Sequence, residues 1–166
     1  CRSIAPSMEQ YQGLFVSYTS LLNQAISNSV TGCAMAINIC LLEKALKMGP
    51  DAVMHDWWIS MVASAFGRRI YLKSPLVRYR QHNNNTIGAT PIEEVRSLKR
   101  SVFNFFSKGR CSLYAPLARQ ARDFLKSYGP ELRLGQSMQL RLVSLLDCLP
   151  CPLSNVLYMF LVMRRN

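Results

Sequence analysis

The stretch "MHDWWISMVASAFG", residues 54–67, carries apolar side chains at the spacing of an α-helix. The repeat of three and four residues is made by Trp58, Met61, Val62, Ala65 and Phe66. This spacing places the five side chains on one face. Gly67 is expected to end the helix, and Asp51 or Asp56 to begin it. The stretch therefore predicts a helix over residues 54–66 whose apolar face packs on a core.

The segments before this helix change character. Residues 9–27 have apolar side chains at helical spacing and predict an amphipathic helix. The next segment, "SVTGCAMAIN" at 29–38, is rich in small and β-branched residues and predicts a short buried strand. Asn38 is expected to cap a following helix, "ICLLEKALKMG", which Gly49 should end.

The segments after residue 67 divide the chain into two kinds of sequence. Two short runs, "RIYL" at 69–72 and "PLVRYR" at 75–80, predict strands, and "QHNNNTIGATP" at 81–91 predicts a loop. Everything from residue 92 onward predicts helices, at about 92–107, 114–127, 131–147 and 153–164. The sequence thus predicts a mixed α/β part followed by a helical part, with a boundary near residue 90.

The composition of the 166 residues is that of a folded domain, with 49% hydrophobic and 17% charged residues. Disorder is excluded by this balance. The net charge of +11 is uneven, because residues 1–67 carry three basic and four acidic side chains whereas residues 68–166 carry seventeen and five. Such a basic excess predicts a polyanionic partner, which could be anionic lipid, nucleic acid or a phosphate-bearing ligand.

The six cysteines favour free thiols in a reducing compartment over a disulfide framework. The pair in "CLPC", residues 148–151, has no second CxxC to complete a zinc site, so we interpret it as two small apolar residues at a helix-ending proline. The run "VLYMFLVM" at 156–163 has eight apolar residues and is followed by two arginines. It is too short to span a membrane but suited to lie on an anionic interface.

A few side chains could carry chemistry. Asp56 at a helix start is by local physics an N-cap, and it is also a candidate general base, because the helix dipole favours its ionised form. Of Trp57 and Trp58, one should be core and the other a platform for the apolar face of a sugar. His82, near Arg80 in "RYRQHNNNT", is either a loop histidine bonded to backbone or a ligand near a diphosphate or metal.

Four short sequence motifs, "TGCAMAIN", "HDWW", "SAFG" and "YRQHNNNTIGA", occur in this order and spacing. Together they resemble the second half of bacterial family 2 glycosyltransferases, and most of all the rhamnosyltransferase-like members that build O-antigen and other surface polysaccharides. The resemblance covers about residues 20–90. It implies a GT-A fold, an α/β sandwich, with residues 1–90 as its acceptor-side part and residues 91–166 as a basic helical region.

The same resemblance implies an activity and a set of site residues. Asp56 would be the general base that takes the proton of an acceptor hydroxyl while a nucleotide-sugar donor loses its nucleoside diphosphate, with inversion. The acceptor would be a saccharide or lipid-linked saccharide. The implied substrate-binding residues are Gly32, Cys33, His55, Trp57, Trp58, Arg80 and His82. His82 would also lie near a divalent cation, Mg²⁺ or Mn²⁺, in the full-length enzyme.

One departure from the family limits this expectation, because no DxD metal motif occurs in the 166 residues. We therefore expect a fragment that is inactive without a nucleotide-binding half. The resemblance implies a cytoplasmic protein that works at the inner face of the bacterial plasma membrane, and the basic tail could hold it there at about 1 kcal/mol per well-placed Lys or Arg. The alternatives are a non-catalytic remnant or membrane-associated adaptor and, disfavoured because no known motif accompanies the charge, a nucleic-acid-binding helical module.

Overall fold

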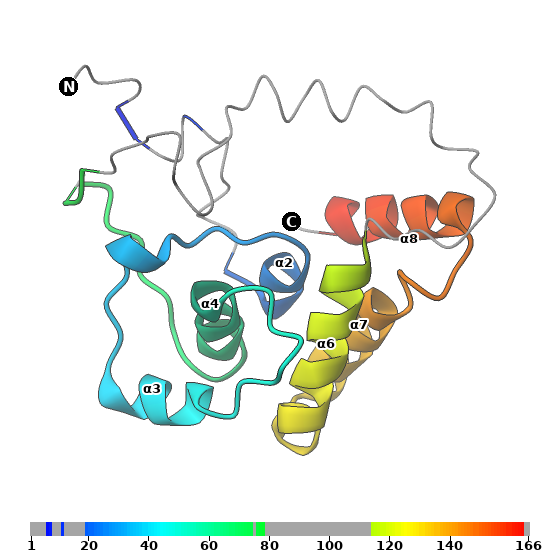
Figure 1. Cartoon of the computed structure of the whole chain (residues 1–166), viewed down its shortest axis with the longest axis horizontal. Coiled ribbons are helices and arrows are strands. Elements are labelled where there is room, and N and C mark those ends of the chain that lie inside the picture. The colour runs from blue at the N-terminus through cyan, green and yellow to red at the C-terminus, as the bar shows by residue number, and fades with distance from the viewer. Residues whose placement is uncertain (1–5, 8–10, 12–18, 75, 79–113, 165–166) are drawn as a thin grey trace.

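The computed structural model describes residues 6–7, 11, 19–74, 76–78 and 114–164 (Figure 1). Its elements are, in order, α2 (Leu21–Ile26), the 3₁₀ turn η1 (Gly32–Ala34), α3 (Ile39–Ala45), α4 (His55–Phe66), α6 (Ala115–Tyr128), the 3₁₀ turn η4 (Gly129–Glu131), α7 (Leu134–Ser144) and α8 (Cys151–Met163). These described ranges contain no strand, so the sheet expected of an α/β fold is absent from them.

The central element is α4, which lies between α2 and α3 and packs against both (Figure 1). Trp58, Met61 and Val62 are fully buried on its apolar face. The Trp58 ring contacts those of Phe124 and Tyr128 on α6, with centroids 5.1 and 6.0 Å away. Full burial of a side chain such as Met61 or Val62 stabilises the fold by about 1.5–3 kcal/mol. The helix predicted over residues 54–66 is confirmed, including its end at Gly67.

The short helix α2 lies in the middle of the core. All six of its residues are buried, and it packs against α4, α6, α7 and α8. The hydroxyl of Ser20 caps it by accepting a hydrogen bond from the amide of Asn23 at 3.2 Å. A helix of this length is unstable alone, so tertiary packing maintains it. Of the helix predicted over residues 9–27, this C-terminal part is observed, whereas residues 8–10 and 12–18 lie outside the described ranges.

A loop joins α3 to α4 and is held by α6. Asn38 caps α3 as predicted, with its side-chain oxygen 2.9 Å from the amide of Leu41, but the helix ends at Ala45, before Gly49. The buried carboxylate of Asp123 accepts from the Asp51 amide at 2.8 Å. A Cβ on Gly49 would overlap this carboxylate. The loop therefore depends on a residue without a side chain at this point.

The helices α6 and α7 form an antiparallel pair joined by η4 (Figure 1). The helix predicted over 114–127 is confirmed by α6, and the one predicted over 131–147 is confirmed in part, because α7 covers only Leu134–Ser144. Arg122 on α6 donates two hydrogen bonds, of 2.8 and 2.6 Å, to the carboxylate of Asp147 just beyond α7. This contact lowers the pKa of Asp147 below its ordinary value.

The helix α8 lies across one end of the α6–α7 pair (Figure 1). The buried Ser154 hydroxyl fastens it by donating to the carbonyl of Leu146 at 2.8 Å. Cys148, which is exposed, and Cys151, which is buried, are both free thiols. Pro150 is the N-cap of α8, so it precedes a helix rather than ending one. Among the described helices, none has the length and apolarity needed to cross a membrane.

Two strand predictions are wrong. Within residues 29–38 the backbone is extended at Thr31 and at Met35, but the residues between them form η1. None of these residues forms a β-bridge. Residues 69–72 form no strand either, and the side chains of Ile70 and Leu72 are exposed. A strand needs a neighbouring backbone to bond, and none of the described segments supplies one. The predicted strand at 75–80 lies partly outside the described residues.

The described parts on both sides of residue 90 share one core. The buried apolar cluster takes side chains from α2 and α4 as well as from α6, α7 and α8. The predicted boundary itself, like the loop at 81–91 and the helix at 92–107, lies outside the described residues.

Candidate functional site

Asp56 lies in the first turn of α4 and is not its N-cap. The N-cap is Met54, whose extended backbone (φ −150°, ψ 147°) leads into the helix without a side-chain capping bond. Asp56 is 8% exposed. Its Oδ1 accepts from the amide of Trp57 at 2.7 Å, and its Oδ2 accepts from the amide of Gly32 at 2.8 Å. The carboxylate thus binds one donor in its own helix and one from a distant segment.

Gly32 fits closely against the start of α4. A Cβ on this residue would lie 3.0 Å from Nε2 of His55 and 3.3 Å from both Cβ and Oδ2 of Asp56. The absence of a side chain is what lets the η1 backbone approach the carboxylate. Two of the motifs singled out in the sequence, "TGC" and "HDWW", are therefore brought together by a direct contact, although they are more than twenty residues apart.

The two tryptophans have different surroundings. Trp58 is fully buried among aromatic rings, so its predicted role in substrate binding is wrong and it belongs to the core. Trp57 is half-buried, and its indole N–H donates to the main-chain carbonyl of Gln24. The prediction that one tryptophan is core is confirmed for Trp58. Trp57 alone of the two retains a partly accessible ring beside Asp56.

A polar network behind Trp57 was missed from the sequence. The Oε1 of Gln24, a buried residue of α2, accepts from the Ser60 hydroxyl at 2.7 Å, and its Nε2 donates to the Ser29 hydroxyl at 3.0 Å. Arg69 reaches the same hydroxyl with Nη2 at 2.8 Å. Burial lowers the pKa of Arg69 below its ordinary value. The available signal was the polar pair Asn23–Gln24 within the run "LLNQAI", whose other residues are apolar.

The remaining predicted residues are placed only in part. His55 is exposed at the first position of α4, and Cys33 is an exposed free thiol in η1. Arg80 and His82, with the metal site predicted at His82, lie outside the described residues. Among the residues that the structure does describe, no group of three or more His, Cys, Asp or Glu side chains could hold a metal ion.

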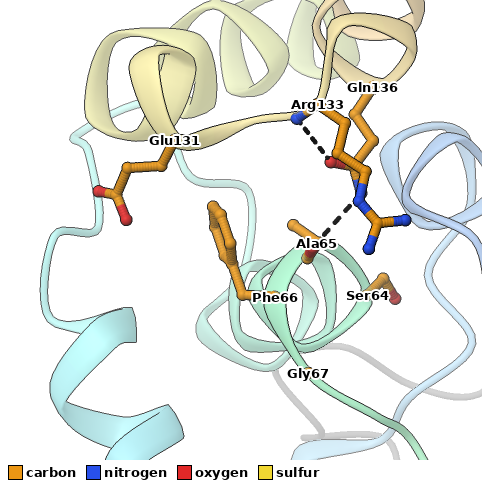
Figure 2. A pocket seen from close by; sticks show the side chains of 7 residues that line it. All are labelled: Ser64, Ala65, Phe66, Gly67, Glu131, Arg133 and Gln136. Atoms are coloured by element: carbon orange, nitrogen blue, oxygen red, sulfur yellow. Dashed lines mark hydrogen bonds between the residues drawn. The ribbon is translucent and has the colours of Figure 1, made fainter.

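A hollow of about 390 Å³ lies at the other end of α4 from Asp56 (Figure 2). Its lining comes from the end of α4, from the turn between α6 and α7 and from the first turn of α7, namely Ser64, Ala65, Phe66, Gly67, Glu131, Arg133 and Gln136. The Nε2 of Gln136 donates to the carbonyl of Ala65 at 3.3 Å and so satisfies one acceptor at the C-terminal end of α4. The candidate carboxylate is not part of this hollow.

The arrangement at the start of α4 suits proton transfer. Each Asp56 oxygen accepts a hydrogen bond from one backbone amide, and a carboxylate oxygen has a second acceptor position. The backbone amides fix the orientation of the carboxylate, which a general base requires. Beside it lie the exposed imidazole of His55 and the half-buried ring of Trp57. A carboxylate, an imidazole and an aromatic ring together could bind and deprotonate a sugar hydroxyl.

Comparison of the chain with protein-family models, with curated proteins and with solved structures gave no match.

Proposed function

We propose that this chain supplies the acceptor side of an inverting glycosyltransferase, with Asp56 as the general base. The observation that carries the proposal is the 2.8 Å contact between Asp56 Oδ2 and the Gly32 amide. This contact joins two of the four sequence motifs that resemble those of family 2 glycosyltransferases. The reaction itself is inferred from the resemblance. An acceptor pocket bordered by Gly32 and Cys33, with a base at Asp56, needs these residues to lie close together, and the contact is consistent with that.

In this proposal the side chains at the start of α4 act on the acceptor. Asp56 accepts the hydroxyl proton as the acceptor oxygen attacks the anomeric carbon and the nucleoside diphosphate leaves. Trp57 offers its accessible ring face to the sugar, and His55 donates to or accepts from a neighbouring hydroxyl. The nucleotide-sugar donor would bind in a nucleotide-binding half of the GT-A fold. Arg80 and His82 of this chain would take part in donor binding together with the divalent cation.

The segment after α4 exposes several apolar side chains. Ile70, Leu72 and Leu76 are 63–75% exposed, on a backbone that pairs with none of the described segments. In the proposed full enzyme these apolar side chains would pack against the nucleotide-binding half. The proposed full enzyme would be cytoplasmic, would act at the inner face of the plasma membrane and would use a lipid-linked or free saccharide as acceptor.

The test uses the natural gene product that contains this chain. Transfer is measured as release of nucleoside diphosphate from UDP- and dTDP-hexoses in the presence of saccharide acceptors. We expect Asp56→Asn to lower kcat by a factor of about 10²–10⁴ with donor binding unchanged, because a positioned general base contributes this much. Asp51→Asn is the matched control, since its exposed carboxylate lies in the loop before α4. Transfer retained by a folded Asp56→Asn variant would reject Asp56 as the base.

A further inference from the structure

One side of α8 presents a continuous apolar surface to solvent. We call it the apolar face of α8, and it consists of Leu153, Val156, Met159, Phe160 and Met163. The spacing of three and four residues places these side chains along one side of the helix. The opposite side, with Cys151, Ser154 and Leu161, is buried against the rest of the protein. The face is therefore separate from the core.

The exposure of this face is larger than an isolated surface residue would explain. Its side chains are 44–75% exposed, and Phe160 is among them. Single exposed apolar residues are ordinary, whereas a contiguous patch of them marks an interaction site. A helix of 13 residues is about 20 Å long, so this one can lie along an interface but cannot cross a bilayer.

The surrounding charge identifies the partner. No residue of α8 is charged, and Arg164 follows it directly, with its guanidinium 4.6 Å from the Phe160 ring centroid. Arg165 follows Arg164 in the sequence, and residues 68–166 carry seventeen basic side chains against five acidic ones. An apolar face beside uncompensated positive charge matches a surface that offers acyl chains and phosphates together. A second copy of this chain would bring like charges together.

We propose that α8 docks on a bilayer that contains anionic phospholipid, with its apolar face at the acyl boundary and Arg164 at the phosphates. The helix lies parallel to the membrane plane. This inference deepens the proposed function by naming the surface that would hold the protein beside a lipid-linked acceptor. It stands apart from the chemistry at Asp56, because none of the residues of the apolar face lies at the start of α4.

The test measures binding of the purified chain to vesicles of phosphatidylcholine alone and of phosphatidylcholine with 30% phosphatidylglycerol, by flotation. We expect binding to the anionic vesicles that weakens as salt is raised. Met159→Ser/Phe160→Ser should weaken it at least tenfold. Ile39→Ser/Leu42→Ser is the matched control, because these exposed apolar residues lie on α3, far from α8 (Figure 1), and it should bind like the wild type.

A second variant keeps the test independent of any change in folding. Arg164→Ala leaves the apolar face intact and should weaken binding to the anionic vesicles about fivefold, with no effect on neutral ones. Absence of wild-type binding, equal binding to both vesicle types, or unchanged binding by Met159→Ser/Phe160→Ser would each overturn the proposal. So would a wild-type dimer in sedimentation that the same double variant abolishes. In the natural gene product that contains this chain, Met159→Ser/Phe160→Ser should leave Asp56-dependent transfer to a soluble acceptor intact, which separates this inference from the proposed reaction.

Discussion

Replacing Asp56 by Asn should destabilise the fold as well as remove the proposed base. The two carboxylate oxygens accept one backbone amide each, at 2.7 and 2.8 Å. An asparagine has one oxygen, so one of the two amides would face an NH₂ group instead of an acceptor. The site is 8% exposed, and water can replace the lost partner only poorly. Hydrogen bonds to charged groups contribute about 1.5–3 kcal/mol, so we expect a loss of about 2 kcal/mol.

The measurement is urea unfolding followed by circular dichroism, with the free energy of unfolding compared at equal m-values. Asp51→Asn again serves as the control, because its exposed carboxylate is 3.9 Å from Arg119 and such a surface pair contributes less than about 1 kcal/mol. Amide exchange gives a local readout, since the Gly32 amide should exchange at least tenfold faster in the Asp56 variant. Equal stability and an unchanged Gly32 exchange rate would refute the idea that this carboxylate holds η1 against α4.

Two further predictions concern the contacts that α6 makes. Gly49→Ala should lower the free energy of unfolding by about 1–3 kcal/mol in urea melts, because its Cβ would overlap the fixed carboxylate of Asp123. Gly135→Ala in α7, where a Cβ meets nothing within 4 Å, is the control and should be neutral or stabilising. Equal losses of stability in the two variants would contradict this prediction. The Arg122 contact lowers the pKa of Asp147, so its stabilisation is complete above about pH 4 and is lost as the pH falls through the lowered value. When the free energy of unfolding is measured against pH, the values for the wild type and for Asp147→Asn should therefore converge below about pH 4. A difference that stays constant with pH would show that the ionised Asp147 does not stabilise the fold.

The helices could be predicted from the sequence because their causes are local. The apolar repeat from Trp58 to Phe66 and the stop at Gly67 specify α4 without reference to the rest of the chain. Asn38 likewise bonds an amide three residues away. The strands could not be predicted with the same success, because a strand exists only when another segment pairs with it. Residues 29–38 have extended backbone at both ends of η1, yet their composition carries no information about a partner.

The candidate site was predictable in part, for a related reason. That Asp56 matters could be inferred, but its bond to Gly32 depends on how η1 and α4 meet, and local capping rules pointed to a different partner. Choosing between Trp57 and Trp58 required the position of α6, because the burial of Trp58 comes from Phe124 and Tyr128. The Gln24 network is equally non-local, since it links α2, α4 and the segments that flank them.

The position of α2 has a consequence for how the protein forms in the cell. This helix is synthesised before α7 and α8, yet it is buried against both. Contacts between such distant parts of a chain close slowly. On the ribosome, the apolar residues of α2 remain without these contacts until α7 and α8 have emerged, and a chaperone would find them exposed during that interval. Chains that stop before α8 should therefore be degraded rather than accumulate.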